Sequence, residues 1–192
     1  RAIYVGGSGP SSPSGENTID FITISSTGNA VDFGDETASS TVEKQGALAS
    51  TTRGIIAGGS GMSGRISFLT IMTTGNTEDF GDLTAQTTAN SGAGNATRGV
   101  ISLGYGNNSI NFITIATTGD AIDFGDRTLD NYSHASCSSP TRMATGGGYD
   151  GSSNTNMIDF VEIATTGNAQ DFGDLSYARR SLGGTSNGHG GL

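Results

Sequence analysis

Carboxylates recur at fixed places in this sequence of 192 residues, and they are its first candidates for chemistry. Four copies of the segment Asp-Phe-Gly-Asp begin at Asp32, Asp79, Asp123 and Asp171. Such carboxylates could bind Ca²⁺, which prefers oxygen ligands. They could instead accept backbone N–H groups of turns, as aspartates next to glycine often do. Because all four copies carry the same residues, we favour the structural role and predict no metal site.

Four arginines recur together with these aspartates. Arg1, Arg53, Arg98 and Arg142 each begin a short apolar run. A ring of guanidinium groups could bind an anion at the mouth of a channel. The alternative is a bidentate ion pair with an aspartate of an Asp-Phe-Gly-Asp segment, formed between neighbouring repeats. Repetition in every copy favours this ion pair.

No combination of residues predicts a catalytic centre. His134 and His189 lie near equivalent ends of two different repeats, which is a weak signal for a metal site. Cys137 is the only cysteine, so no disulfide can form within the chain, and we expect its small side chain to be buried. Serine is too abundant for any Ser-His-Asp set to be singled out. We therefore predict no catalytic residue, no metal and no cofactor.

The aspartates and arginines belong to a repeat that must position them. A phenylalanine precedes the first aspartate of each copy by eleven residues, at Phe21, Phe68, Phe112 and Phe160. The four arginines are 44 to 52 residues apart, a period typical of repeat architectures such as propellers. We predict a single repeat domain over residues 1–192, with repeats at about 1–52, 53–97, 98–141 and 142–192.

Each repeat carries the pattern of four short strands, so the predicted fold class is all-β. An apolar run that ends in glycine predicts a buried strand, and a Gly-, Ser- and Asn-rich loop of variable length follows it. An alternating segment, the turn Thr-Gly-Asn and the segment Asp-Phe-Gly-Asp then predict a hairpin. A run of small residues completes the pattern. No window has the apolar period of a helix, so we expect almost no helix.

The position at which the chain enters the repeat predicts how the array closes. The sequence begins at the second strand of a repeat and ends with a small-residue segment. A C-terminal strand could therefore complete the blade that the N-terminus begins, which would remove an exposed sheet edge. We predict a small propeller of four four-stranded blades, closed in this way. The alternative is an open arc that closes only with a second chain. Because the first residue is Arg1 rather than Met, we expect a piece of a longer protein.

The order of these elements resembles kelch repeats. The best match is the last copy, with Gly147-Gly-Tyr-Asp-Gly, Phe160, Phe172 where kelch has Trp, and Arg179-Arg180. The chain departs from kelch in having no Trp, and its third copy has Leu103-Gly104 in place of Gly-Gly. The longer phrase Ala-Thr-Thr-Gly-Asn-Ala-x-Asp-Phe-Gly-Asp-Leu, with the closing His-Gly-Gly-Leu, is similar to repeat-bearing virion structural proteins of tailed phages, especially marine ones. That resemblance implies a tail, fibre or decoration role and carries over no catalytic residue.

Charge excludes some classes of partner. The formal net charge is −9, which opposes binding to nucleic acid and to an anionic membrane surface. No apolar run is long enough to span a membrane, so we expect no membrane insertion.

The variable loops are the best candidates for a binding site, because binding residues usually lie on loops of a fixed scaffold. We predict a non-enzymatic virion module that binds a host glycan or another virion protein and forms a homo-oligomer, located in the virion. The alternative is a self-assembling subunit of an extracellular filament, and a propeller enzyme acting on carbohydrate ranks last. Aromatic, amide and charged side chains suited to such ligands occur at Arg65, Tyr105, Asn107, Asn108, Tyr149, Asp150 and Asn154.

Overall fold

A computed structural model describes residues 1–10, 15–39 and 41–187 of the chain. In these ranges the chain forms strands, turns and loops and no helix, so the predicted all-β class is confirmed. The strands are β1 Ala2–Val5, β2 Thr18–Ile22, β3 Val31–Asp35, β4 Gly46–Ala49, β5 Arg53–Ala57, β6 Arg65–Thr70, β7 Glu78–Asp82, β8 Ser91–Gly94, β9 Arg98–Ser102, β10 Ser109–Thr114, β11 Ile122–Asp126, β12 Ala135–Ser138, β13 Arg142–Gly146, β14 Met157–Glu162 and β15 Gln170–Asp174.

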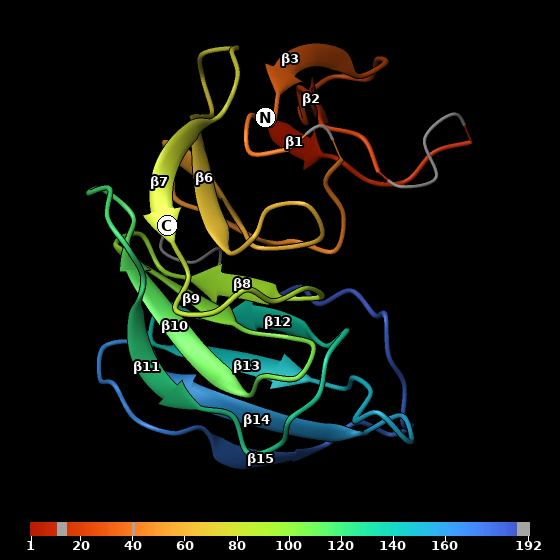
Figure 1. The fold of residues 1–192 in the computed structure, drawn as a ribbon, viewed down its shortest axis with the longest axis vertical. Helices are drawn as coiled ribbons and strands as arrows, with labels where there is room; N and C mark the ends of the chain where they lie inside the picture. Colours follow the sequence, from red (N-terminus) through yellow and green to blue (C-terminus); the bar gives the residue numbers. More distant parts are fainter. Residues whose placement is uncertain (11–14, 40, 188–192) are drawn as a thin grey trace.

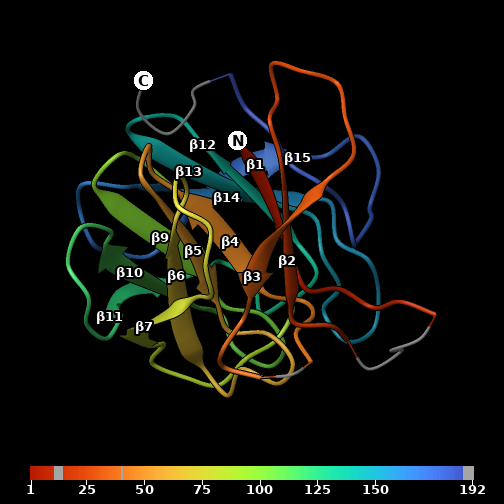
Figure 2. The same cartoon turned by 90° about the horizontal axis from the view of Figure 1, so that it is seen from above.

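The strands form four antiparallel sheets in chain order. The first sheet is β1-β2-β3, the second β4-β5-β6-β7, the third β8-β9-β10-β11 and the fourth β12-β13-β14-β15. Within each sheet, strands that are consecutive in sequence pair with one another, as expected for antiparallel meanders. Figure 1 shows the sheets following one another along an arc, with β1–β3 and β12–β15 at opposite ends of the long axis. Figure 2, from above, places the same two sheets at the near and far sides.

A bulge in each outer hairpin explains the glycine of Asp-Phe-Gly-Asp. The register between the third and fourth strands of the second sheet shifts between Ile66 and Ser67, opposite Gly81. Gly81 has φ +144°, a conformation that favours glycine. The same shift occurs at the equivalent position of the other three sheets. The extra residue in the bulge is the phenylalanine, so the bulge sets where that ring points.

The apolar core consists of the contacts between neighbouring sheets. Phe33, Phe80 and Phe124, the second phenylalanines of the first three copies, are buried among aliphatic side chains. Each ring also meets the first phenylalanine of its own hairpin edge to face, with centroids 5.9 to 6.0 Å apart. Burial of these rings between sheets is what holds successive repeats together.

Backbone hydrogen bonds repeat at each of the three sheet-to-sheet interfaces. The amide of Gly75 donates to the Phe33 carbonyl of the preceding sheet at 2.7 Å. The equivalent bonds from Gly119 to Phe80 and from Gly167 to Phe124 have the same length. The predicted turn Thr-Gly-Asn therefore does more than reverse the chain, because its glycine docks the hairpin onto the preceding repeat.

The first sheet has three strands rather than the predicted four. Among residues 1–10, 15–39 and 41–187, β1 has a ladder partner only in β2. The C-terminal segment 181–186 lies beside β12 and the residues before it instead: Ser181 N donates to Ser133 O at 2.8 Å, and Ser186 Oγ to Ser138 O at 2.6 Å. Closure of the first blade by this chain's own C-terminus thus stays a prediction, and its last residues, 188–192, lie outside the described ranges.

Candidate functional site

Three tyrosines from different loops form one aromatic cluster near the third and fourth sheets. The Tyr105 and Tyr132 rings lie 4.9 Å apart, and the Tyr132 and Tyr149 rings 5.6 Å apart, both edge to face. The Arg180 guanidinium lies over the Tyr149 ring, 4.2 Å from its centroid. Tyr105 is 64% exposed, and the other two rings are half-buried. We call Tyr105, Tyr132, Tyr149 and Arg180 the tyrosine surface.

Backbone bonds fix the positions of these rings. Tyr132 and Tyr149 exchange two backbone hydrogen bonds, of 3.1 and 2.9 Å. Tyr105 N donates to Thr88 O at 3.0 Å, which ties its loop to the segment before β8. Gly148 precedes Tyr149 with φ +117°, and a Cβ there would stand 2.9 Å from the Asn131 side chain. The tyrosine surface therefore rests on a rigid scaffold, as a binding site requires.

Two of the predicted polar residues lie beside this surface. Asp150 accepts backbone N–H groups of Ser152 and Ser153, both at 2.8 Å, and these bonds lower the pKa of its carboxyl below the usual value. It is exposed, so the ionised carboxylate faces solvent next to Tyr149. Asn154 is exposed as well and forms an isolated bridge with Tyr149. Both can offer hydrogen bonds to a ligand that covers the ring.

The other three predicted residues have structural partners. Asn107 Oδ1 accepts the Ser109 N–H at 2.8 Å, and Asn108 Nδ2 donates to Arg127 O at 3.3 Å. Both amides thus hold the loop that carries Tyr105. Arg65 lies on the second sheet, where its Nε is 3.3 Å from Asp79 Oδ1. It takes no part in the tyrosine contacts, so the structure brings together only part of the predicted set.

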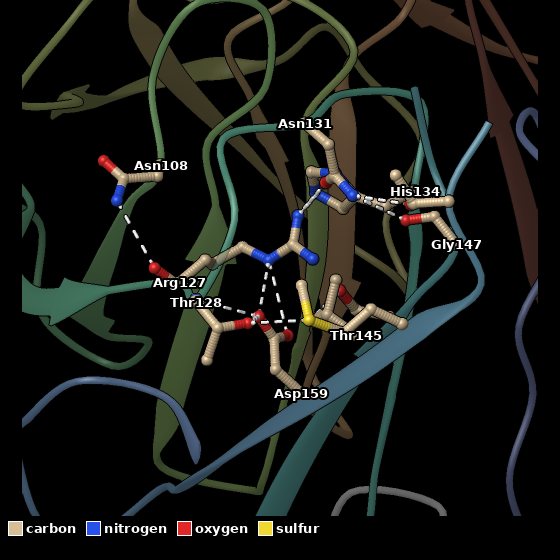
Figure 3. A network of polar contacts seen from close by, with 11 residues as sticks. Asn108, Arg127, Thr128, Asn131, His134, Thr145, Gly147 and Asp159 are labelled. Atoms are coloured by element: carbon tan, nitrogen blue, oxygen red, sulfur yellow. Dashed lines mark hydrogen bonds and ion pairs between the residues drawn. The ribbon is translucent and has the colours of Figure 1, made fainter. Parts of the chain in front are cut away.

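A second polar cluster lies buried between the third and fourth sheets, and Figure 3 shows it from close by. Arg127 Nε is 3.3 Å from Asp159 Oδ2, with side chains 1% and 2% exposed. Arg127 Nη1 also contacts Asn131 Oδ1, and it lies 3.0 Å from His134 Nδ1. Thr128 donates to Asp159 Oδ2 through both its N–H and its hydroxyl.

This cluster is a structural contact without access for a ligand. Burial, with the positive charge of Arg127, lowers the pKa of His134 to about 3. His134 is therefore neutral near pH 7. Equivalent positions at the other interfaces hold different polar partners: Glu36 Oε1 accepts from Ser67 Oγ at 2.8 Å, and Thr84 N donates to Asn111 Oδ1 at 2.9 Å.

The predicted ion pair between the repeated arginines and the aspartates of Asp-Phe-Gly-Asp is wrong. Each arginine lies over the first phenylalanine of its repeat, 4.4 to 4.7 Å from the ring centroid. Arg53 and Arg98 each donate from Nη1 to an isoleucine carbonyl of the next sheet, Ile115 and Ile163, at 2.8 Å. Each guanidinium thus has a cation–π contact with a ring. Arg142 also forms an ion pair, but with Glu162 at 2.5 Å rather than with an aspartate of Asp-Phe-Gly-Asp.

Metal binding and membrane spanning find no support in the described residues. There, no group of three His, Cys, Asp or Glu side chains could hold a metal ion. His189, one of the two histidines considered for a metal, lies outside the described ranges. Cys137 is half-buried on β12 rather than fully buried. None of the described segments forms a helix long and apolar enough to cross a membrane.

Sequence reasoning missed Tyr132 and Arg180 as members of the site. Both lie outside the variable loops, in the connections that lead toward small-residue segments. The available signal was the presence of three of the five tyrosines in neighbouring loops and connections of two repeats. Comparison with models of known protein families and with curated proteins found no match to this chain.

Proposed function

We propose that this protein is a non-enzymatic structural or receptor-binding module of a virion that binds a host glycan through the tyrosine surface. The observation that carries the proposal is the row of rings formed by the exposed Tyr105, Tyr132 and Tyr149, with Asp150 and Asn154 next to Tyr149. Aromatic faces pack against the apolar faces of sugar rings, and adjacent carboxylates and amides accept or donate hydrogen bonds to hydroxyl groups.

The virion setting is supported by the resemblance of the repeated phrase to virion structural proteins of tailed phages. A tail, fibre or decoration location follows from that resemblance, and another virion protein is the alternative ligand of the same loops. We also propose that the four sheets are kelch-like blades of a propeller-like array. The strand order and the arc of the sheets support this architecture (Figure 1).

The proposal includes no reaction. The innermost strands β4, β8 and β12 would line the axis of such an array, and they carry no acidic residue. Glycoside hydrolysis by the usual route needs two carboxyl groups on either side of the scissile bond. A second candidate function, a self-assembling filament subunit, is favoured by the exposed apolar residues at the two ends of the array.

A glycan array followed by calorimetry with monomeric ligand tests the proposal. Tyr105→Ala should weaken binding by about tenfold, because the stacking face is lost. Tyr105→Phe keeps that face and should bind as the natural protein does. Met72→Ala, at an exposed side chain in a hairpin of the second sheet, is the control and should leave the glycan affinity unchanged. An empty array, or a Tyr105→Ala variant with full affinity, would remove the glycan proposal.

A further inference from the structure

One sheet-to-sheet interface is used three times within the chain, and both of its halves are left exposed at the ends of the array. At each interface the earlier sheet in the chain contributes the trailing half and the later sheet the leading half. The trailing half contains the second phenylalanine of a repeat. Phe33, Phe80 and Phe124 are 2%, 3% and 2% exposed, whereas the equivalent Phe172 in the last sheet is 60% exposed. The last sheet therefore has the residues of the trailing half, but no described part of the chain covers them.

The leading half of the interface contains the isoleucine that ends the alternating segment. Ile115 and Ile163 are 2% and 0% exposed and Ile71 is half-buried, because each packs against the preceding sheet. The equivalent Ile24, in the first sheet, is 71% exposed. Tyr4 of β1 is 56% exposed, although its equivalent Ile101 in β9 is fully buried. The first sheet therefore presents an apolar face with no preceding sheet to cover it.

The tight backbone contact of the interface is also open at the ends. A Cβ on Gly34, Gly81 or Gly125 would stand 2.5 Å from the backbone of the next sheet's hairpin turn, which is Thr-Gly-Asn or, opposite Gly81, Thr-Gly-Asp. The equivalent Gly173 has no described atom within 4 Å of such a Cβ. The amides of the turn glycines Gly75, Gly119 and Gly167 donate to the preceding sheet, whereas the equivalent amide of Gly28 has no backbone acceptor among the described residues. Gly173 and Gly28 are therefore the two halves of a fourth contact that the described part of the chain does not make with itself.

Polar partners complete the match between the two ends. At the second and third internal interfaces Thr84 donates to Asn111, and Thr128 donates to Asp159, in each case through N–H and hydroxyl. At the first interface the equivalent Thr37 bonds Thr77 instead. The equivalent positions at the open ends are Ser176 in the last sheet and Asp20 in the first. A serine hydroxyl and an aspartate carboxylate can form the same pair of bonds.

Within the described ranges the first sheet also lacks the fourth strand that the other three sheets have, and its open edge at β1 could accept one. A groove of about 350 Å³ runs beside β1, lined by apolar residues of β1, β4 and β5 such as Ile3, Leu48 and Ile55. In the other sheets the innermost strand is contributed by the segment that follows the preceding sheet. The segment that follows the last sheet, residues 183–186, already lies beside β12 as β12 lies beside β8.

We propose that a second copy of this chain docks head to tail, with its last sheet against the first sheet of its neighbour. Phe172 of one copy then covers Ile24 of the next, and Ser176 bonds Asp20. Residues 183–186 add to β1 as its fourth strand, antiparallel, with Gly183 opposite Val5 as Gly46 is opposite Ala57. Two unlike surfaces meet in this contact, so repetition gives a closed ring or a filament.

Sedimentation velocity across a wide range of protein concentration tests the proposal with two charge substitutions. Natural protein should associate as its concentration rises. Ile24→Asp and Phe172→Asp should each weaken self-association by at least about tenfold, because a carboxylate is buried in the apolar contact. Met72→Asp and Ile122→Asp, at side chains 69% and 60% exposed away from the ends, are matched controls and should associate as the natural protein does. Far-UV circular dichroism verifies that each variant is folded.

Mixing the two blocked variants separates head-to-tail docking from the alternatives. The Ile24→Asp chain keeps an intact last sheet, and the Phe172→Asp chain keeps an intact first sheet. An equal mixture should therefore form a dimer and stop there. A contact between like surfaces predicts that one of the two variants dimerises on its own, before any mixing, and closure of each chain on itself predicts natural protein that is monomeric at every concentration. Either result overturns the proposal, whatever the glycan array shows.

Discussion

The buried ion pair between Arg127 and Asp159 leads to a prediction about stability that can be checked against the equivalent, uncharged interface of the neighbouring repeat. Both side chains are almost fully buried, and Nε and Oδ2 are 3.3 Å apart. Asp159→Asn keeps the shape of the side chain but leaves the arginine without a countercharge. Removing one partner of a buried pair costs about 3–5 kcal/mol of unfolding free energy. We expect a loss of stability in this range.

The neighbouring interface shows which residues can replace the whole cluster. Where the third and fourth sheets have Arg127, Asn131, His134 and Asp159, the second and third have Leu83, Thr87, Asn90 and Asn111. Those four residues include no charged group. A graft of all four, Arg127→Leu, Asn131→Thr, His134→Asn and Asp159→Asn, should therefore lie within about 2 kcal/mol of the natural protein, because replacing a buried pair by well-packed residues is often neutral.

Urea unfolding followed by far-UV circular dichroism measures both changes. Repeat arrays can unfold in parts, so the slope of free energy against urea is compared among variants before the free energies are. Asp123→Asn, at an exposed position of β11, is the matched control and should change stability by less than about 0.5 kcal/mol. The reasoning is refuted if Asp159→Asn costs no more than this control, or if the four-residue graft is as unstable as Asp159→Asn alone.

Three further expectations follow from single residues. Gly81→Ala should lower the free energy of unfolding by about 3 kcal/mol, because φ is +144° and the new Cβ would meet the next sheet. Gly173→Ala should lower it by about 1 kcal/mol, from backbone strain alone. Equal losses in urea unfolding would argue against the tight contact. Gly173→Ala should nevertheless weaken head-to-tail association in sedimentation, since that site then resembles Gly81, and unchanged association would count against the proposed docking. The pKa of His134 lies below its unfolded value of about 6.5, so the unfolded chain binds the proton first and stability falls as pH falls from about 6.5 toward 3. Between pH 8 and pH 5 the loss should be about 2 kcal/mol, absent in His134→Gln and present in His189→Gln; a pH dependence that survives His134→Gln would show that another group causes it.

The repeat made most of the fold predictable from the sequence. Alternation of apolar residues placed the strands, and the recurring Thr-Gly-Asn and Asp-Phe-Gly-Asp segments placed the outer hairpins. The partner of each arginine could not be predicted, because a ring and a carboxylate are both attractive to a guanidinium, and only the direction of the side chain decides between them. The three-stranded first sheet could not be predicted for a similar reason. The sequence pattern identified an unpaired edge at β1, but it did not show where the C-terminal segment would lie.

The candidate site was predictable only where it lies in the variable loops. Tyr105 and Tyr149 stood out as aromatic residues in loops of changing length, and the structure brings them together through Tyr132. Tyr132 lies just before β12, and it meets the other two tyrosines only because neighbouring sheets pack together. Sequence spacing does not reveal such contacts between sheets. Arg65 has the right chemistry but belongs to the second sheet, so the path of the chain excludes it from the site.

A disulfide trap is the most direct measurement of the claim that both ends of the array carry halves of one interface. At the first internal interface, the Thr37 and Thr77 hydroxyl oxygens are 3.3 Å apart. Their equivalents at the open ends are Ser176 and Ala30. In a Cys137→Ser background, Ser176→Cys and Ala30→Cys chains mixed under mild oxidation should form a disulfide-linked heterodimer. Met72→Cys mixed with Ile122→Cys should not. Equal cross-linking in both mixtures, or none in the first, would contradict the account.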